Sequence, residues 1–201
     1  MGRTSDARQR LVESSLELIH SQSYSTVSVE DLCKKAGVNK GSFYYFFPSK
    51  HALTLEALEA YWQKSKTEVL EPAFLTDIAP LARINRVFEM AFQFHQLHHT
   101  GEGGLFGCLL GNLTCELGSY DPQVRQKLQE IFVEFYAYFE VALFEAQGQD
   151  ELAHDIFVPD AARGLVAYLQ GLILMAKAHN QVSLIKELSS NALRMLGISD
   201  Y

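Results

Sequence analysis

Residues 24–53 read YSTVSVEDLCKKAGVNKGSFYYFFPSKHAL, and this stretch decides the fold of the N-terminal part of the chain. Ser28 is a natural helix N-cap, and Asp31, three residues later, completes a capping box with a shorter acid than usual. Gly37 is typical of the position just past a helix C-terminus. The stretch therefore predicts one helix that ends at Ala36 and, after a tight turn, a second helix over about residues 40–46, capped by Asn39.

A further helix precedes this pair. Val12, Leu16 and Ile19 recur at helical spacing, which predicts an amphipathic helix over about residues 5–22. Three short helices with a tight turn between the second and third have the spacing of a helix-turn-helix, whose last helix enters the major groove of DNA. Pro48 ends that helix, and a long helix is expected from Lys50 to about residue 70.

Helical spacing also dominates the remainder of the chain, where strand-like alternation is nearly absent. Helices are expected over about residues 80–99, 105–117, 121–147, 160–179 and 183–197. The sequence thus predicts an all-α protein of about nine helices, with a DNA-binding domain over residues 1–50 and a second helical domain over residues 51–201. The stretch 165–178 is apolar on nearly every face, so it must be buried on more than one side, and the second side is often another subunit.

Composition agrees with a soluble regulator. The chain has 201 residues, of which 48% are hydrophobic and 20% charged, and no apolar run reaches the length of about 18 residues that spans a membrane. Three cysteines without a secretory segment favour reduced thiols and a cytoplasmic location. The net charge of −7 is uneven: residues 1–50 hold seven basic and five acidic side chains, so a slightly basic head precedes an acidic body.

Enzyme signatures are missing from the sequence. It contains no P-loop, no G-x-S-x-G, no H-E-x-x-H and no dinucleotide fingerprint, so neither catalysis nor a cofactor is expected. An all-helical enzyme, or an adaptor that does not bind DNA, is the alternative reading.

The stretch quoted above resembles the TetR family of bacterial repressors. The matching positions are Thr26, Ala36, Gly37, Val38, Gly41, Tyr44, Phe47, Lys50 and Leu53. The resemblance implies a homodimer whose two heads bind a palindromic operator, and a helical domain over residues 51–201 that dimerises and senses an effector. The dimer is expected to form through the helices at about 160–179 and 183–197, and effector binding is expected to weaken the affinity for DNA.

Residue type indicates which side chains of the head face DNA. Small residues at the start of the third helix can lie against base edges, whereas hydroxyl and ammonium groups can bind phosphate oxygens. The expected DNA-binding residues are Arg3, Thr26, Ser28, Lys40, Gly41, Ser42, Tyr44, Tyr45 and Lys50. The family usually has His at the position of Tyr45. Phe43, Phe46, Phe47 and Cys33 are expected in the core of the head.

Residues 107–128 and 169–188 resemble the NemR-like branch of the family, whose members respond to electrophiles and oxidants. The resemblance implies that Cys108 is a sensor thiol and Lys177 its partner. A helix N-terminus and a nearby ammonium both lower the pKa of a thiol, and Cys108 lies near the start of its expected helix. Cys108 can equally be inert packing, because cysteine is among the most buried residue types.

A cavity for a small organic effector is the competing sensor. Its expected lining is apolar and aromatic with a few hydroxyls, as in many ligand pockets: Met90, Phe94, Phe132, Phe135, Tyr136, Phe139, Tyr168 and Met175. Each of these residues can instead be ordinary core. His95, His98 and His99 have helical spacing that can bind a metal, but no carboxylate or cysteine lies nearby in the sequence, so no metal site is expected.

Overall fold

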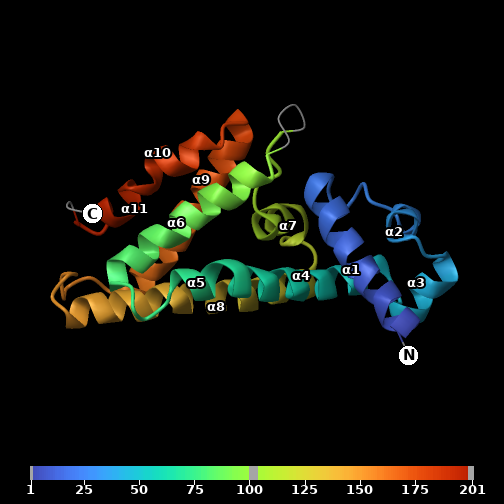
Figure 1. The fold of residues 1–201 in the computed structure, drawn as a ribbon, viewed down its shortest axis with the longest axis horizontal. Coiled ribbons are helices and arrows are strands. Elements are labelled where there is room, and N and C mark those ends of the chain that lie inside the picture. The colour runs from blue at the N-terminus through green and yellow to red at the C-terminus, as the bar shows by residue number, and fades with distance from the viewer. Residues whose placement is uncertain (1, 100–103, 199–201) are drawn as a thin grey trace. The chain divides into compact units, whose positions relative to one another are not determined.

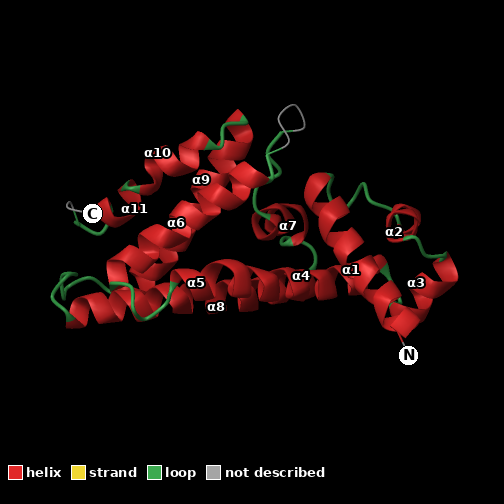
Figure 2. Ribbon diagram, in the orientation of Figure 1, coloured by secondary structure: helices red, strands yellow, loops and turns green. Residues whose placement is uncertain are grey.

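The structure is a computed structural model that describes residues 2–99 and 104–198, with the side chains of residues 2–5 left out. These residues form helices, turns and loops and contain no strand, which confirms the all-α prediction (Figures 1 and 2). No helix within the described ranges is long and apolar enough to cross a membrane. The chain divides into two compact units, Met1–Lys64 with Asn112–Leu128, and Ser65–Gly111 with Gln129–Tyr201.

The first unit begins with α1 (Gly2–Ser21), α2 (Val29–Ala36), α3 (Lys40–Phe46) and α4 (Lys50–Ser65). The expected bounds of α2 and α3 are confirmed, and α1 starts earlier than expected. Leu11, Leu32, Phe43 and Leu53 are fully buried and join the four helices in one small core. The unit also takes in most of α7 (Leu109–Leu117) and the first turns of α8 (Pro122–Gly148).

The second unit contains the π-helical turn η1 (Lys66–Leu70), α5 (Glu71–Ala73), α6 (Pro80–Leu97) and the remainder of α8. Its last elements are α9 (Val158–His179), α10 (Ser183–Ser189) and α11 (Asn191–Arg194). Within this unit α10 packs against both α6 and α9, which Figure 1 shows as a red segment beside a green and an orange one.

Three expected helices differ from the structure. The long helix predicted to end near residue 70 changes to a π-helical turn after Ser65. The helix predicted over 105–117 begins only at Leu109, because Gly107 has a φ of 78° that a right-handed helix does not accommodate. The helix predicted over 183–197 is two short ones, interrupted at Ser190.

Arg83 of α6 anchors the loop that precedes its helix. Its guanidinium donates to the backbone oxygens of Ile78 and Thr76 at 2.6 and 3.1 Å and to the Glu145 carboxylate of α8 at 2.7 Å. The fork of donors of an arginine suits three acceptors in different directions, so this buried cation is satisfied by its surroundings.

Candidate DNA-binding surface and sensor residues

Local sequence sets the position of α3. The Ser28 side chain accepts the backbone N–H of Asp31, and the Asp31 carboxylate accepts the backbone N–H of Ser28, so the predicted capping box is confirmed. Gly37 ends α2 with a φ of 64°, in the left-handed region that glycine adopts without strain. Asn39 then starts α3 by accepting the N–H of Ser42 at 2.7 Å. The turn between the two helices is therefore determined by three caps within twelve residues of sequence.

The aromatic run of α3 divides between two sides. Phe43 is fully buried and Phe47 is nearly so, while Phe46 is only half-buried. Tyr44 and Tyr45 are 57% and 76% exposed, and the Tyr44 ring packs edge-on against Phe43 at 5.2 Å. The two phenylalanines hold α3 on the core of the head, and the two tyrosines extend from it into solvent, together with the exposed Gly41 at the helix start.

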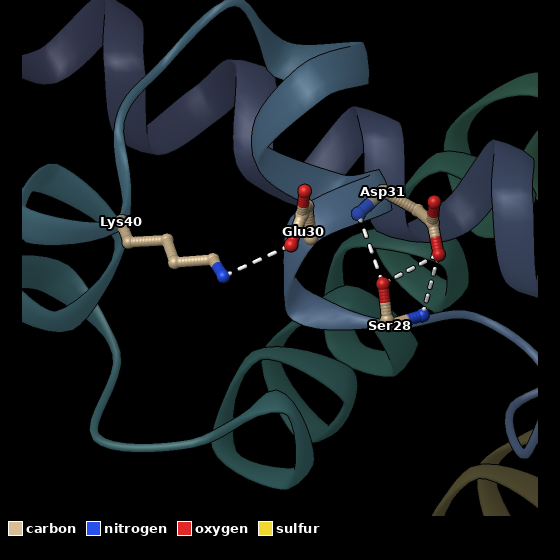
Figure 3. A network of polar contacts seen from close by, with 4 residues as sticks. All are labelled: Ser28, Glu30, Asp31 and Lys40. Carbon is tan, nitrogen blue, oxygen red and sulfur yellow. Dashed lines mark hydrogen bonds and ion pairs between the residues drawn. The ribbon is translucent and has the colours of Figure 1, made fainter.

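Lys40, the first residue of α3, is exposed and bound to a carboxylate of its own head. Its ammonium lies 3.0 Å from the Glu30 carboxylate on α2, as Figure 3 shows. The hydrogen bond to Glu30 raises the pKa of Lys40 above its ordinary value, so this lysine is charged at any physiological pH.

Lys50 is occupied inside the head. Its ammonium donates to the backbone oxygens of Tyr24 and Val27, both at 2.7 Å, and lies 4.1 Å from the centre of the Tyr24 ring. Burial lowers the pKa of Lys50, and the negative charge of Glu116 opposes that effect. One of the three N–H donors of the ammonium remains for a phosphate, so the phosphate contact expected for Lys50 stays a prediction.

The other expected phosphate ligands near α2 also have partners in the head. The Ser28 hydroxyl belongs to the capping box, and the Thr26 hydroxyl lies 2.9 Å from that of Ser23. Both residues are exposed, so either hydroxyl can still accept or donate a second bond. Arg3 lies in the first turn of α1, and its side chain is outside the described residues.

The structure adds a set of contacts that no pattern in the sequence predicts. The Glu116 carboxylate of α7 accepts the backbone N–H groups of Tyr24 and Ser25, at 2.9 and 2.7 Å, in the turn between α1 and α2. His51 lies 2.9 Å from Asp121, which in turn caps the first turn of α8. These pairs are up to 92 residues apart in sequence, and no local pattern announces them.

The three cysteines differ in their access to solvent, which a sensor thiol needs. Cys33 is buried in the head core, as expected, whereas Cys108 is half-buried and Cys115 is exposed. Cys108 stands directly before α7, so its thiol lies at a helix N-terminus, although the helix starts later than predicted. Lys177 is exposed in the last turn of α9, and it belongs to the same compact unit as Cys108. Their pairing stays a prediction.

The eight expected pocket residues have different environments. Phe135 and Phe139 are buried, and the Phe139 ring packs edge-on against Phe74 at 5.3 Å. Tyr168 donates its hydroxyl to the backbone oxygen of Leu188, which ties α9 to α10. Met175 is 46% exposed.

The remaining members of the expected pocket are half-buried, namely Met90, Phe94, Phe132 and Tyr136. Phe132 and Tyr136 stack with ring centres 6.2 Å apart on α8, and Phe94 packs on His98 at 4.3 Å. The eight expected pocket residues thus include both core and surface side chains. A cavity that they share stays a prediction.

The three clustered histidines have separate partners. His95 is buried, His98 bonds the backbone oxygen of Phe94 at 2.7 Å, and His99 lies 3.1 Å from the side-chain oxygen of Asn180. Within residues 2–99 and 104–198 no group of three potential ligands is arranged to hold a metal.

Comparison with known proteins decides the family. Residues 11–57 match the bacterial regulatory proteins of the tetR family, and residues 80–190 match the tetracyclin repressor-like C-terminal domain. The chain belongs to the TetR family. It is therefore a DNA-binding transcriptional regulator, and the family consists of regulators rather than enzymes.

Two curated relatives extend this assignment over most of the chain. The transcriptional regulator AcuR of Cereibacter sphaeroides is 35% identical over 85% of this chain and 76% of its own length. The transcriptional repressor DhaR of Mycobacterium sp. strain GP1 is 32% identical over 88% of this chain and 85% of its own.

Solved structures show the same architecture. A regulatory protein TetR from Rhodobacter sphaeroides has a TM-score of 0.84 at 30% identity, and the match covers 94% of this chain and 97% of that one. The reduced form of E. coli NemR has a TM-score of 0.80 at 20% identity, covering 96% and 100%. At that identity the NemR likeness concerns the fold alone.

Proposed function

We propose that this TetR-family protein is a homodimeric transcriptional repressor that binds a palindromic operator in the cytoplasm. The observation that carries the proposal is that α3 has one buried face and one exposed face. Buried Phe43 fixes the helix on the head core, while Lys40, Tyr44 and Tyr45 remain exposed on it. A helix fixed in this way presents its first turns to base edges and phosphates of the major groove. The relative DhaR, which is named a repressor, supports repression rather than activation.

Exposed apolar side chains support a dimer through the second compact unit. On α9, Leu174 and Met175 are exposed, and on α8 the same holds for Val133, Val141 and Phe144. Such side chains on two consecutive long helices are typical of a surface that another subunit covers. We therefore place the dimer contact on α8 and α9. The sequence also predicts a dimer contact on the segment that forms α10 and α11. Within one chain, α10 of this segment packs against α6 and α9.

Release from the operator is proposed to follow from a small organic effector or from an electrophile or oxidant that modifies Cys108. Half-burial gives reagents access to this thiol, which stands directly before α7. The thiolate sulfur attacks the chlorine of hypochlorous acid and releases hydroxide. Water then displaces chloride from the sulfenyl chloride and loses a proton, which leaves a sulfenic acid whose sulfur has given two electrons to chlorine. An effector of either kind acts only by preferring the conformation that binds DNA poorly.

Operator binding is tested with a duplex selected by the protein from a random library. Fluorescence anisotropy is then measured for this duplex and for a scrambled one at several salt concentrations, because sequence-independent affinity falls steeply with salt. We expect the selected duplex to contain two half-sites related by a dyad. If selection enriches no sequence over the library, the proposal is refuted.

Dimerisation is tested by sedimentation equilibrium on the full chain. Leu174→Arg is expected to yield monomers, and Leu97→Arg, at an apolar residue of α6 that is 82% exposed, is the matched control. A monomeric wild-type protein at micromolar concentration contradicts the dimer, and a dimer that survives Leu174→Arg contradicts its placement on α9.

The thiol proposal is tested by comparing Cys108→Ser with Cys115→Ser, since Cys115 is the more exposed of the two thiols. Hypochlorite or N-ethylmaleimide should reduce operator affinity of the wild type and of Cys115→Ser about equally, and Cys108→Ser should resist. If Cys108→Ser loses affinity as the wild type does, modification of Cys108 is not the signal.

A further inference from the structure

Several cations of the head are paired with carboxylates. Arg8 is paired with Glu56, and Lys35 is paired with Glu17. A third pair, between Arg10 and Asp6, has a separation of 3.6 Å. The fourth is the pair of Lys40 and Glu30, which is the one that involves the helix expected to read the DNA sequence.

The Lys40–Glu30 pair lies where α2 meets the start of α3. Glu30 stands in the first turn of α2, beside the capping box of Ser28 and Asp31, and its side chain is 76% exposed. Figure 3 shows the Lys40 side chain reaching across from α3 to the Glu30 carboxylate, while Asp31 turns to the Ser28 backbone and hydroxyl. Of the two carboxylates, Asp31 is engaged with its own helix cap and Glu30 is directed at the reading helix.

A phosphate that binds Lys40 must share the ammonium with this carboxylate, which occupies one of its three N–H donors. Lys40 needs no reorientation of α3 to reach Glu30, so the pair is formed before DNA arrives. A DNA phosphate that approaches Lys40 must also approach the negative charge of Glu30. Since binding to phosphates is independent of sequence, this competition weakens binding to any duplex.

Base edges, unlike phosphates, can donate hydrogen bonds to the Glu30 carboxylate. The first turn of the reading helix lies in the major groove, where cytosine N4 and adenine N6 present amino donors. A carboxylate can accept a hydrogen bond from such an amino group, whereas a phosphate offers it no donor. Where Glu30 meets such an amino group, the hydrogen bond offsets the cost that its charge imposes, and a phosphate offers no such offset.

We propose that Glu30 is a specificity-determining residue of the head, which withholds Lys40 from phosphates and so suppresses sequence-independent binding. Discrimination is a difference between two affinities, and it grows when the wrong complex is weakened as well as when the right one is strengthened. The inference rests on the DNA-binding function of the protein, and it adds the residue that separates operator from other DNA.

The test is Glu30→Gln in the full chain, assayed by anisotropy on a scrambled duplex and on the duplex selected by the wild type. Loss of an exposed ion pair and of its charge should tighten scrambled-duplex binding about two- to fivefold. The slope of log affinity against log salt should become steeper by about one unit per head, because Lys40 gains a phosphate. Affinity for the selected duplex should rise less or fall, so the ratio of the two affinities decreases.

Two controls separate this effect from a general change in charge or fold. Glu89→Gln makes the same charge change on α6, where Glu89 accepts an i,i+4 bond from Gln93, and it should leave the ratio of affinities unchanged. In the Lys40→Gln background, the added Glu30→Gln change should no longer steepen the salt slope of scrambled-duplex binding.

Equal tightening on both duplexes, or no change on either, overturns the role of Glu30 while leaving operator binding intact. Failure of the wild type to select any duplex overturns the function itself and is visible before the variants are compared. A change in thermal midpoint of Glu30→Gln, measured alongside, identifies a variant whose head has unfolded. The Lys40→Gln single variant then decides the inference: its salt slope on the scrambled duplex should equal that of the wild type, and a shallower slope overturns the role of Glu30.

Discussion

Removing the Glu116 carboxylate should loosen the turn between α1 and α2. In Glu116→Ala, the backbone N–H groups of Tyr24 and Ser25 both lose their acceptor. A hydrogen bond to a charged group contributes about 1.5–3 kcal/mol. The Ser25 bond is exposed, so water can replace the carboxylate there, while the Tyr24 bond is part-buried and water replaces it less well. We therefore expect a loss of about 2 kcal/mol of unfolding free energy, mostly from Tyr24.

The assay is thermal unfolding followed by circular dichroism. For a chain of this size, about 2 kcal/mol lowers the Tm by roughly 4–8 °C. Glu116→Gln keeps one acceptor oxygen without the charge. Because neutral hydrogen bonds are about half as strong, its Tm should lie between those of the wild type and Glu116→Ala. Glu89→Ala, which removes an exposed carboxylate of α6, should stay within about 1 °C of the wild type.

The contribution of Glu116 should also depend on pH. Burial alone would raise the pKa of this carboxyl, but hydrogen bonds from Ser25 and Tyr24 and the charge of Lys50 outweigh burial and lower it. Because the folded protein has the lower pKa, the stabilisation is complete above the ordinary value of 4.5 and disappears as the pH falls through the folded pKa. A Tm difference between wild type and Glu116→Ala that is absent at pH 7, or that grows on acidification, would refute the reasoning.

Three further variants probe the interior and the surface of the head. Ser15 is fully buried, and its hydroxyl has no hydrogen-bond partner in the described part of the chain. Ser15→Ala should therefore leave the unfolding free energy unchanged or raise it by up to about 1 kcal/mol. A loss of more than about 1 kcal/mol in urea unfolding would show a partner for the hydroxyl. Phe43→Ala should cost about 3–5 kcal/mol, whereas Tyr45→Phe should change stability by less than about 0.5 kcal/mol and still weaken binding to the selected duplex. Unaltered DNA affinity of Tyr45→Phe would remove its hydroxyl from the contact surface.

Local chemistry made the head predictable. Ser28, Asp31, Gly37 and Asn39 each act within a few residues of themselves, so the sequence contains all that is needed to place α2, the turn and α3. The exposure of Tyr45 and the burial of Phe43 follow from helical spacing once the helix is placed.

Contacts between distant segments were beyond the sequence for a physical reason. The acceptor of the Tyr24 and Ser25 N–H groups lies more than ninety residues later, and nothing in its neighbours distinguishes Glu116 from a solvated acid. Lys50 has the residue type of a phosphate ligand, yet its ammonium binds two carbonyls that only the folded turn brings to it. The break at Ser190 has no glycine or proline to announce it.

The inclusion of residues 112–128 in the same compact unit as residues 1–64 bears on how the head can be exchanged with that of another regulator. Exchanging heads between two regulators at the end of the helix-turn-helix, near residue 57, keeps the recipient's own residue 116. In such a chimera, the α1–α2 turn would come from one parent and the side chain at position 116 from the other. A hybrid of this protein should therefore take the donor's equivalents of both segments, so that Glu116 and the turn that it holds come from the same parent.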